Sequence, residues 1–123
     1  LPTRTDWRLL AYAQSFWSHV DLGFDVTTTK VAKEVANNSN LIITATPSHD
    51  AILVSEWINP GTHITAIGAD GFGKQELDVR LMARADVIVV DSVKHCSQYG
   101  EISGALKLGF IDESRLKLLS VAC

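Results

Sequence analysis

Cysteine, proline and glycine are scarce in this 123-residue chain, which contains 2 Cys, 3 Pro and 8 Gly. The two cysteines, Cys96 and Cys123, form no C-x-x-C motif, which excludes a disulfide framework and a redox or metal cluster. The same cysteine usage favours a cytoplasmic location, where thiols stay reduced. Because proline and glycine are few and follow no repeat, a collagen-like or low-complexity chain is excluded as well.

A strong excess of one charge and long hydrophobic runs are also lacking. The 11 Lys and Arg residues stand against 14 Asp and Glu residues, which gives a net charge of −3 without a block of like charges. A basic patch is the usual mark of nucleic-acid and membrane-surface binders, so we expect neither partner. The apolar runs are too short to cross a bilayer. With 46% hydrophobic and 20% charged residues, the composition predicts one globular domain over residues 1–123.

The first part of the chain carries apolar residues at helical spacing. They are Leu9, Ala13, Phe16 and Val20, with Trp7 and Trp17 widening the apolar stripe. We therefore predict a helix over residues 6–22. This divides the domain into an N-terminal helical region, 1–23, and an α/β core, 24–123.

Beyond residue 23, short aliphatic or β-branched runs alternate with segments of helical character. The predicted strands are 24–29, 41–46, 63–67, 87–90 and 118–122. The predicted helices are 30–37, 76–84 and 112–117, whereas 50–58 fits either a helix or irregular structure. Strands that read as continuous aliphatic runs are buried on both faces, and interleaved helices favour parallel pairing. The pattern therefore predicts a doubly wound α/β fold.

The loop Gly68-Ala-Asp-Gly-Phe-Gly-Lys74 joins a predicted strand to a predicted helix. Its glycines run G-x-x-G-x-G and not G-x-G-x-x-G, which argues against a dinucleotide loop with Asp91 on the ribose. Its G-x-x-x-x-G-K pattern resembles a P-loop, but Gln75 replaces the hydroxyl residue that binds Mg²⁺. A simple turn is the alternative. Asp70 favours a ligand site, because open α/β sheets bind ligands at the carboxyl ends of their strands, where a carboxylate can act as general acid or base.

The run Thr44-Ala45-Thr46-Pro47-Ser48 ends another predicted strand. Small and hydroxylated residues at this place allow a flat ligand to lie over the sheet edge while offering hydrogen-bond donors. The alternative is a plain strand end, at which Pro47 stops the ladder and Ser48 caps the next segment. The histidines show no metal-ligand spacing, so we predict no metal site.

Several stretches of the chain together form a pattern more specific than any single glycine motif. They are Asn40-Leu-Ile-Ile-Thr-Ala-Thr-Pro-Ser48, Glu56-Trp57, Pro60-Gly-Thr-His-Ile-Thr-Ala-Ile-Gly-Ala-Asp70, Gly73-Lys-Gln-Glu-Leu-Asp78, Ala83-Arg-Ala-Asp-Val-Ile-Val-Val-Asp-Ser92 and Gly100-Glu101. Over residues 40–109, this pattern resembles the ornithine cyclodeaminase/mu-crystallin family. Residues 5–14 resemble the helix that follows the glycine-rich loop of that family.

This resemblance implies an incomplete Rossmann-like fold with three layers and a mainly parallel sheet of four to five strands. It implies that Asp70, in the family's G-x-D-x-x-G-K loop, donates or accepts a proton near the substrate's α-carbon. It also implies that Thr44, Ala45 and Thr46 lie on the nicotinamide side of bound NAD(P). Family members oxidise an amino acid to an imine or reduce cyclic imines, and some are not enzymes. An amino acid or cyclic imine is therefore the implied ligand.

Departures from the family's pattern leave two hypotheses for the function. Neither the family's glycine-rich phosphate loop nor its N-terminal substrate region is found, which indicates a truncated dinucleotide-binding-type domain. Such a domain keeps the nicotinamide-side and proton-transfer half of the site, so it needs a partner chain for NAD(P)-linked turnover. The alternative is a non-catalytic remnant that acts as an oligomeric interaction module. In either case we expect the isolated chain to bind NAD(P) weakly, because pyrophosphate contacts supply much of dinucleotide affinity.

We predict a homo-oligomer, with a dimer as the commonest symmetry. Residues 41–46 either pair directly with 24–29 or expose a hydrogen-bonding edge, and the apolar stripe that includes Trp7 and Trp17 is broad. Light scattering at tens of micromolar should therefore give twice the 13.4 kDa chain mass, with one of these tryptophans in the interface. A monomer that holds both tryptophans in its own core would contradict this prediction.

Overall fold

The computed structural model describes residues 8–12 and 25–122, and for residues 8–12, 25 and 26 it describes the backbone only. Its elements in chain order are β1 (Arg8–Tyr12), β2 (Asp25–Thr29), α1 (Ala32–Asn38), β3 (Leu41–Thr44), the 3₁₀ turn η2 (Ser55–Trp57), β4 (His63–Ala66), α2 (Arg80–Arg84), β5 (Ile88–Val90), α3 (Val93–Cys96), α4 (Gly100–Lys107), the 3₁₀ turn η3 (Glu113–Arg115), β6 (Leu116–Leu118) and α5 (Leu119–Ala122). No helix in these ranges is long and apolar enough to cross a membrane.

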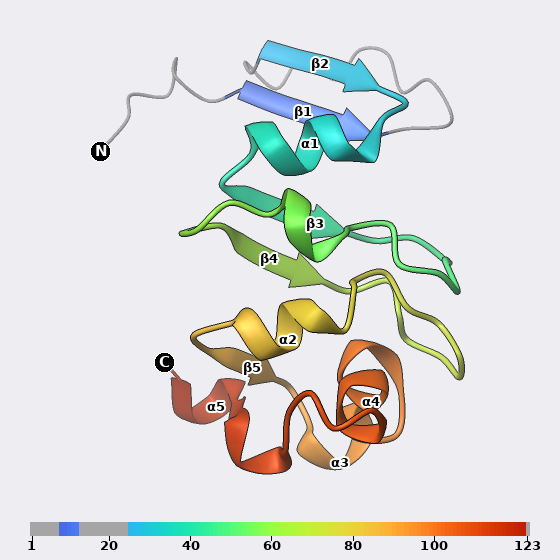
Figure 1. Cartoon of the computed structure of the whole chain (residues 1–123), viewed down its shortest axis with the longest axis vertical. Coiled ribbons are helices and arrows are strands. Elements are labelled where there is room, and N and C mark those ends of the chain that lie inside the picture. The colour runs from blue at the N-terminus through green and yellow to red at the C-terminus, as the bar shows by residue number, and fades with distance from the viewer. Residues whose placement is uncertain (1–7, 13–24, 123) are drawn as a thin grey trace.

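The described strands form three parallel pairs, β1 with β2, β3 with β4, and β5 with β6. The pairs follow one another along the long axis of the molecule, with helices between and beside them (Figure 1). The α/β class with parallel strands is therefore confirmed. The described ladders join six strands in three separate pairs, whereas the sequence predicted one sheet of four to five strands.

The predicted helix over residues 6–22 is wrong where the structure describes it. Residues 8–12 form β1, which pairs in register with β2 from Arg8 opposite Asp25 to Tyr12 opposite Thr29. The same strand contradicts two related predictions within residues 8–12, the family helix over residues 5–14 and the helical region 1–23. A short apolar run fits a strand as well as a helix, and here a non-local partner decides. The rest of this prediction, including Trp7 and Trp17, lies outside the described residues.

Elsewhere the predicted strands and helices are found with changed bounds. The strands predicted over 24–29, 41–46, 63–67 and 87–90 correspond to β2, β3, β4 and β5, and the helix 30–37 corresponds to α1. The segment 50–58 is irregular apart from η2. Helix α2 takes only the end of the predicted helix 76–84, because Leu77 forms a parallel bridge with Leu53 and so holds this part extended.

The carboxyl-terminal predictions need larger corrections. The predicted helix 112–117 is the 3₁₀ turn η3 followed by strand β6. The predicted strand 118–122 is wrong beyond Leu118, because α5 follows directly. Helices α3 and α4 were not predicted at all. Glycine has poor helix propensity, and Gly100 and Gly104 weaken the helical signal of α4.

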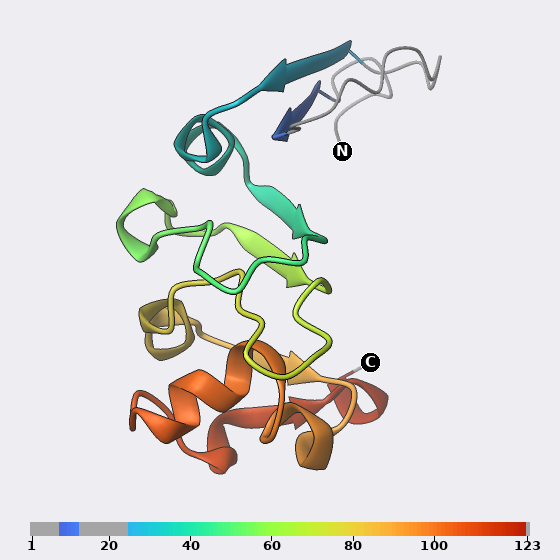
Figure 2. The same ribbon diagram turned by 90° about the vertical axis from the view of Figure 1, so that its right-hand side faces the viewer.

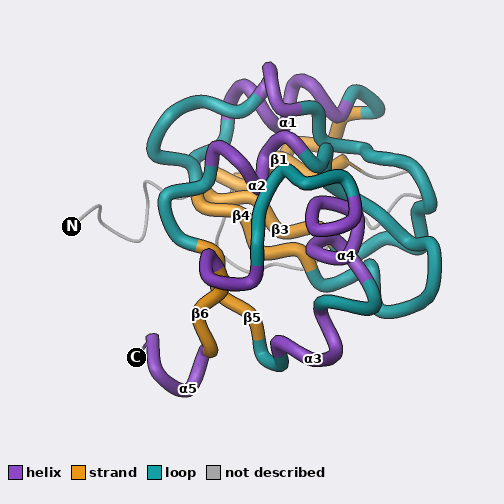
Figure 3. The backbone as a smooth tube through the Cα atoms, turned by 60° about the horizontal axis from the view of Figure 1, so that its bottom comes forward, coloured by secondary structure: helices purple, strands orange, loops and turns teal. Residues whose placement is uncertain are grey.

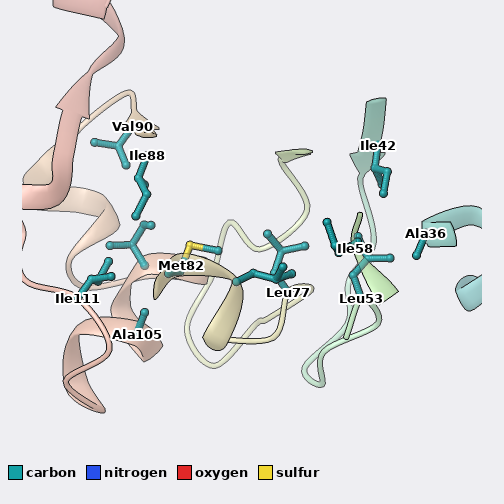
Figure 4. Packing of buried hydrophobic residues seen from close by; sticks show 12 residues of the cluster. Ala36, Ile42, Leu53, Ile58, Leu77, Met82, Ile88, Val90, Ala105 and Ile111 are labelled. Atoms are coloured by element: carbon teal, nitrogen blue, oxygen red, sulfur yellow. The ribbon is translucent and has the colours of Figure 1, made fainter. Parts of the chain in front are cut away.

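Buried apolar side chains form one cluster along the molecule (Figure 4). Its members include Ala36, Ile42, Leu53, Ile58, Leu77, Met82, Ile88, Val90, Ala105 and Ile111. In β3, Ile42 and Thr44 are buried while Leu41 and Ile43 are exposed. Helices α1 and α2 lie on the same side of the strands (Figure 2). Burial of β3 on both faces, which its aliphatic run predicts, is therefore not found in the described part of the chain.

Strand β3 pairs with β4, and β2 takes β1 as its partner. The direct pairing of residues 41–46 with 24–29, one of two possibilities raised by the sequence, therefore does not occur. Strands β3 and β4 run in the same direction, and the loops that follow them leave from the same end (Figure 1). The loop after β4 reaches α4 (Figure 3), where a Cβ on Gly100 would lie 2.6 Å from the Ala69 oxygen, and this arrangement places the candidate site.

Candidate functional site

The loops after β3 and β4 touch each other at Thr46 and Gly68. The ladder continues past both strands, since the Ile67 amide donates to the Thr44 carbonyl at 2.9 Å. A Cβ atom on Gly68 would lie 2.3 Å from the Thr46 nitrogen and 2.4 Å from the Thr46 oxygen. No side chain fits in that space. The structure thus brings together the Thr44–Thr46 strand end and the Gly68–Lys74 loop, the two motifs that the sequence singled out.

The carboxylate of Glu76 holds this contact in place. It is fully buried and accepts three hydrogen bonds, from the Thr44 hydroxyl at 2.7 Å, the Thr46 amide at 2.5 Å and the Gly68 amide at 2.9 Å. Hydrogen bonds to an ionised acceptor are stronger than neutral ones and offset the cost of removing a carboxylate from water. Glu76 was not among the predicted site residues. Its place in the Gly73–Asp78 motif was the available signal.

Glu101, in the first turn of α4, fixes the backbone from which Glu76 projects. Its two carboxylate oxygens accept the amides of Glu76 at 2.6 Å and Leu77 at 2.9 Å. The preceding Gly100 has φ of +72°, and a Cβ there would lie 2.6 Å from the Ala69 oxygen. Burial raises the pKa of Glu101, the two amide hydrogen bonds lower it, and the charge of Glu76 raises it further. The sequence did not predict this role, because it did not predict α4.

Asp70 lies on the surface of the loop after β4, with 74% of its side chain exposed. Its Oδ1 atom is 2.6 Å from the Lys74 ammonium nitrogen. The hydrogen bond and the positive charge of Lys74 lower the pKa of Asp70. The Asp70 carboxylate is therefore ionised at neutral pH.

The three predicted cofactor residues lie in different environments. The Thr44 side chain is buried and its hydroxyl donates to Glu76, so the hydroxyl has a structural partner already. Ala45 is exposed, and Thr46 is half-buried with its hydroxyl accepting the Ser48 amide at 3.3 Å. Of the three, Thr44 has a buried side chain and Ala45 an exposed one, and their place beside a nicotinamide stays a prediction.

A cavity of about 190 Å³ separates the end of the Gly68–Lys74 loop from α4. Lys74 and Lys107 line it together with Ser103 and Phe72, so its wall carries two cationic side chains among polar and apolar groups. Among residues 27–122, whose side chains the structure describes, no three His, Cys, Asp or Glu side chains come together as a metal site.

An ion-pair network supports the segment that leads from Glu76 into α2. Asp78 accepts the Ser55 amide at 3.2 Å and pairs with the Arg80 guanidinium, which also binds Glu56. The Arg80 hydrogen bonds lower the pKa of Asp78 to about 2. Arg84 donates to the carbonyls of Ser55 and Ile58. Together these contacts connect α2 to the η2 turn.

The family of the chain follows from its similarity to known proteins. The sequence model of the ornithine cyclodeaminase/mu-crystallin family matches residues 10–117, most of the chain. The chain belongs to this family. The match starts inside β1, well before residue 40, where the motif pattern begins.

Three relatives show what kinds of protein the family contains. Alanine dehydrogenase of Archaeoglobus fulgidus is 46% identical over 78 residues, 63% of this chain and 24% of the relative. The solved iminosuccinate reductase of Paracoccus denitrificans, in complex with NAD⁺, has a TM-score of 0.74 and 32% identity, covering 80% of this chain and 30% of that one. The Δ¹-pyrroline-2-carboxylate reductase of Thermococcus litoralis, in complex with NADH and L-proline, has a TM-score of 0.72 and 30% identity, covering 79% and 30%. These structural neighbours are Rossmann-like NAD-binding domains, and their likeness to this chain confirms a Rossmann-like fold for it. The chain spans about a quarter of the curated relatives' length.

Replacing Gly68 with alanine should destabilise the domain by about 2 kcal/mol or more, because its methyl group overlaps the Thr46 backbone and the Glu76 carboxylate. Gly71→Ala is the matched control in the same loop, since a Cβ there meets Lys74 only at 3.7 Å, an ordinary contact. Urea unfolding of both variants measures the difference. Equal stability of the two variants would contradict the close approach of the loops.

Asp78 should contribute stability that is lost in acid. Its folded pKa of about 2 lies below the ordinary 3.8, so its contribution is complete above pH 4 and disappears as pH falls toward 2. Because Arg80 is half exposed, we expect Asp78→Asn to cost only about 1 kcal/mol at pH 6 and almost nothing near pH 2. Urea midpoints across this range measure it, with exposed Asp86→Asn as the control. A pH-independent loss in D78N would show that the ion pair is not responsible.

Proposed function

We propose that this chain forms the nicotinamide-side and proton-transfer part of an NAD(P)-dependent site that acts on an amino acid or cyclic imine. The observation that carries the proposal is the contact between Thr46 and Gly68, which joins the strand end predicted to face the nicotinamide to the loop that bears Asp70. The family contains dehydrogenases, imine reductases and cyclodeaminases, and this chain's reaction lies within that range.

Each proposed role uses a property of the residue in this structure. Bound NAD(P) supplies hydride transfer at the substrate's α-carbon. Ala45 and Thr46 provide a small, partly exposed surface over which a flat ring can lie. Asp70, ionised at neutral pH and 2.6 Å from the Lys74 ammonium group, accepts a proton from the substrate nitrogen or from an attacking water. In the direction of imine reduction, the same carboxylate stabilises a protonated imine.

Affinity for NAD(P) in the isolated chain should be low. The sequence contains no G-x-G-x-x-G loop, which in dinucleotide-binding domains offers backbone amides to the pyrophosphate. Ala45, Thr46 and Asp70 cannot replace that anion site. We therefore propose that turnover requires groups beyond the ones that this chain provides.

A non-catalytic interaction module is the second candidate. The exposed Leu41 and Ile43 side chains and the free side of β3 in the described part of the chain favour it, because apolar surface and unpaired strand edges promote association. We propose a cytoplasmic homodimer in either case. A dimer is named for the archaeal alanine dehydrogenase structure, which this chain resembles at 37% identity and a TM-score of 0.71.

Titration with NADH and NADPH tests the proposal. We expect the Ala45 and Thr46 amide signals to shift in NMR spectra with a dissociation constant of about 1 mM, a weak affinity of about −4 kcal/mol. Ala45→Trp should abolish these shifts by filling the space for the ring, whereas Ala51→Trp, at another exposed alanine, should leave them unchanged. Calorimetry provides an independent affinity.

Two outcomes would contradict the proposed function. A micromolar or tighter constant would contradict the expected lack of a pyrophosphate site. Saturating NADH that moves no signal near Ala45, Thr46 or Asp70 would favour the non-catalytic module.

A further inference from the structure

Glu76 is the largest fully buried side chain in the described part of the molecule, and it is charged. Its Oε1 atom accepts the Thr46 amide, and its Oε2 atom accepts both the Thr44 hydroxyl and the Gly68 amide. The donors come from the end of β3, the loop after it and the loop after β4. A buried carboxylate without partners is strongly unfavourable, so this set of donors is needed as a whole.

A neutral amide cannot replace this carboxylate. The Thr46 and Gly68 amides can only donate, and each faces a different oxygen of Glu76. A glutamine side chain has one oxygen, so its NH₂ group must face one of the two amide donors. The two acceptor oxygens of Glu76 therefore satisfy both amides at once, which a glutamine side chain cannot do.

We propose that Glu76 is a positioning residue of the candidate site, through which the strand end with Ala45 and Thr46 is kept in register with the loop that carries Asp70. Glu101 holds Glu76 in place, because it accepts the Glu76 amide and so fixes this backbone to the first turn of α4. The roles of Thr46 and Asp70 rest on the proposed function, whereas the hydrogen-bond geometry does not. Glu76 itself is fully buried, so its proposed role is exerted through Thr46 and Gly68.

The Glu76→Gln variant tests the proposal without any cofactor. We expect the Thr46 and Gly68 amide protons to leave the downfield positions typical of bonds to a carboxylate. We also expect them to exchange with solvent about tenfold faster or more, the effect of losing a charged hydrogen bond. Amides of the core residues Ile88 and Ala105 should change little. The matched control is Glu56→Gln, at an exposed glutamate in the Arg80 network.

The Thr44→Val variant keeps the proposal testable if E76Q fails to fold. Valine has nearly the shape of threonine but its side chain donates no hydrogen bond. In T44V, Oε2 of Glu76 therefore accepts a hydrogen bond from the Gly68 amide alone. The Gly68 amide should then move further downfield, while the Thr46 amide, on the other oxygen, should stay in place. No change at Gly68 in T44V would overturn the shared-oxygen geometry.

The remaining outcomes separate positioning from general stability. Unchanged Thr46 and Gly68 amides in E76Q, or equal loosening of every amide in the domain, would overturn the proposal. In E76Q the NADH-induced shifts at Thr46 should weaken at least threefold more than the fraction of unfolded protein explains. If NADH shifts nothing in the wild-type chain while the amide results hold, the proposed function fails and the positioning of the two loops stands.

Discussion

Everything at the candidate site depends on the close approach of Thr46 and Gly68 around a buried carboxylate. Parallel pairing of β3 and β4 delivers both loops to the same end of the strands, but pairing alone leaves their amides without partners. Glu76 supplies those partners, and the lack of a side chain at Gly68 creates the room. The two conditions depend on each other, since a Cβ at Gly68 would also lie 2.5 Å from Oε1 of Glu76.

Charged groups two residues apart serve opposite purposes here. Lys74 lies toward the surface and pairs with exposed Asp70, where water screens the attraction and little stability results. The pair lowers the pKa of Asp70. Glu76 points inward from the same segment, where its hydrogen bonds are worth more and its burial costs more. One short stretch thus carries both an exposed ion pair and a buried carboxylate that joins two loops.

The sequence predicted those elements whose signal is local. The aliphatic runs of β3 and β5 were recognisable because neighbouring residues alone carry their signal. The helix prediction for residues 8–12 was wrong, because Arg-Leu-Leu-Ala-Tyr fits a helix by spacing but forms a strand by pairing with β2. Helix α4 was missed since Gly100 and Gly104 argue against a helix. The structure explains Gly104 by packing, because a Cβ there would lie 3.3 Å from Val79 and 3.4 Å from the Gln75 side chain.

By itself, the sequence determined the family, the α/β class with parallel strands and the order of motifs that places Asp70 after one strand and Thr44–Thr46 after another. Only the tertiary structure decided what holds those motifs together. The hydrogen bonds of Glu76 span 32 residues to Thr44 and 30 to Thr46, and that of Glu101 spans 25 to Glu76. No local pattern encodes such partners, because a buried carboxylate and the amides that satisfy it are recognised as a set only when the chain has folded.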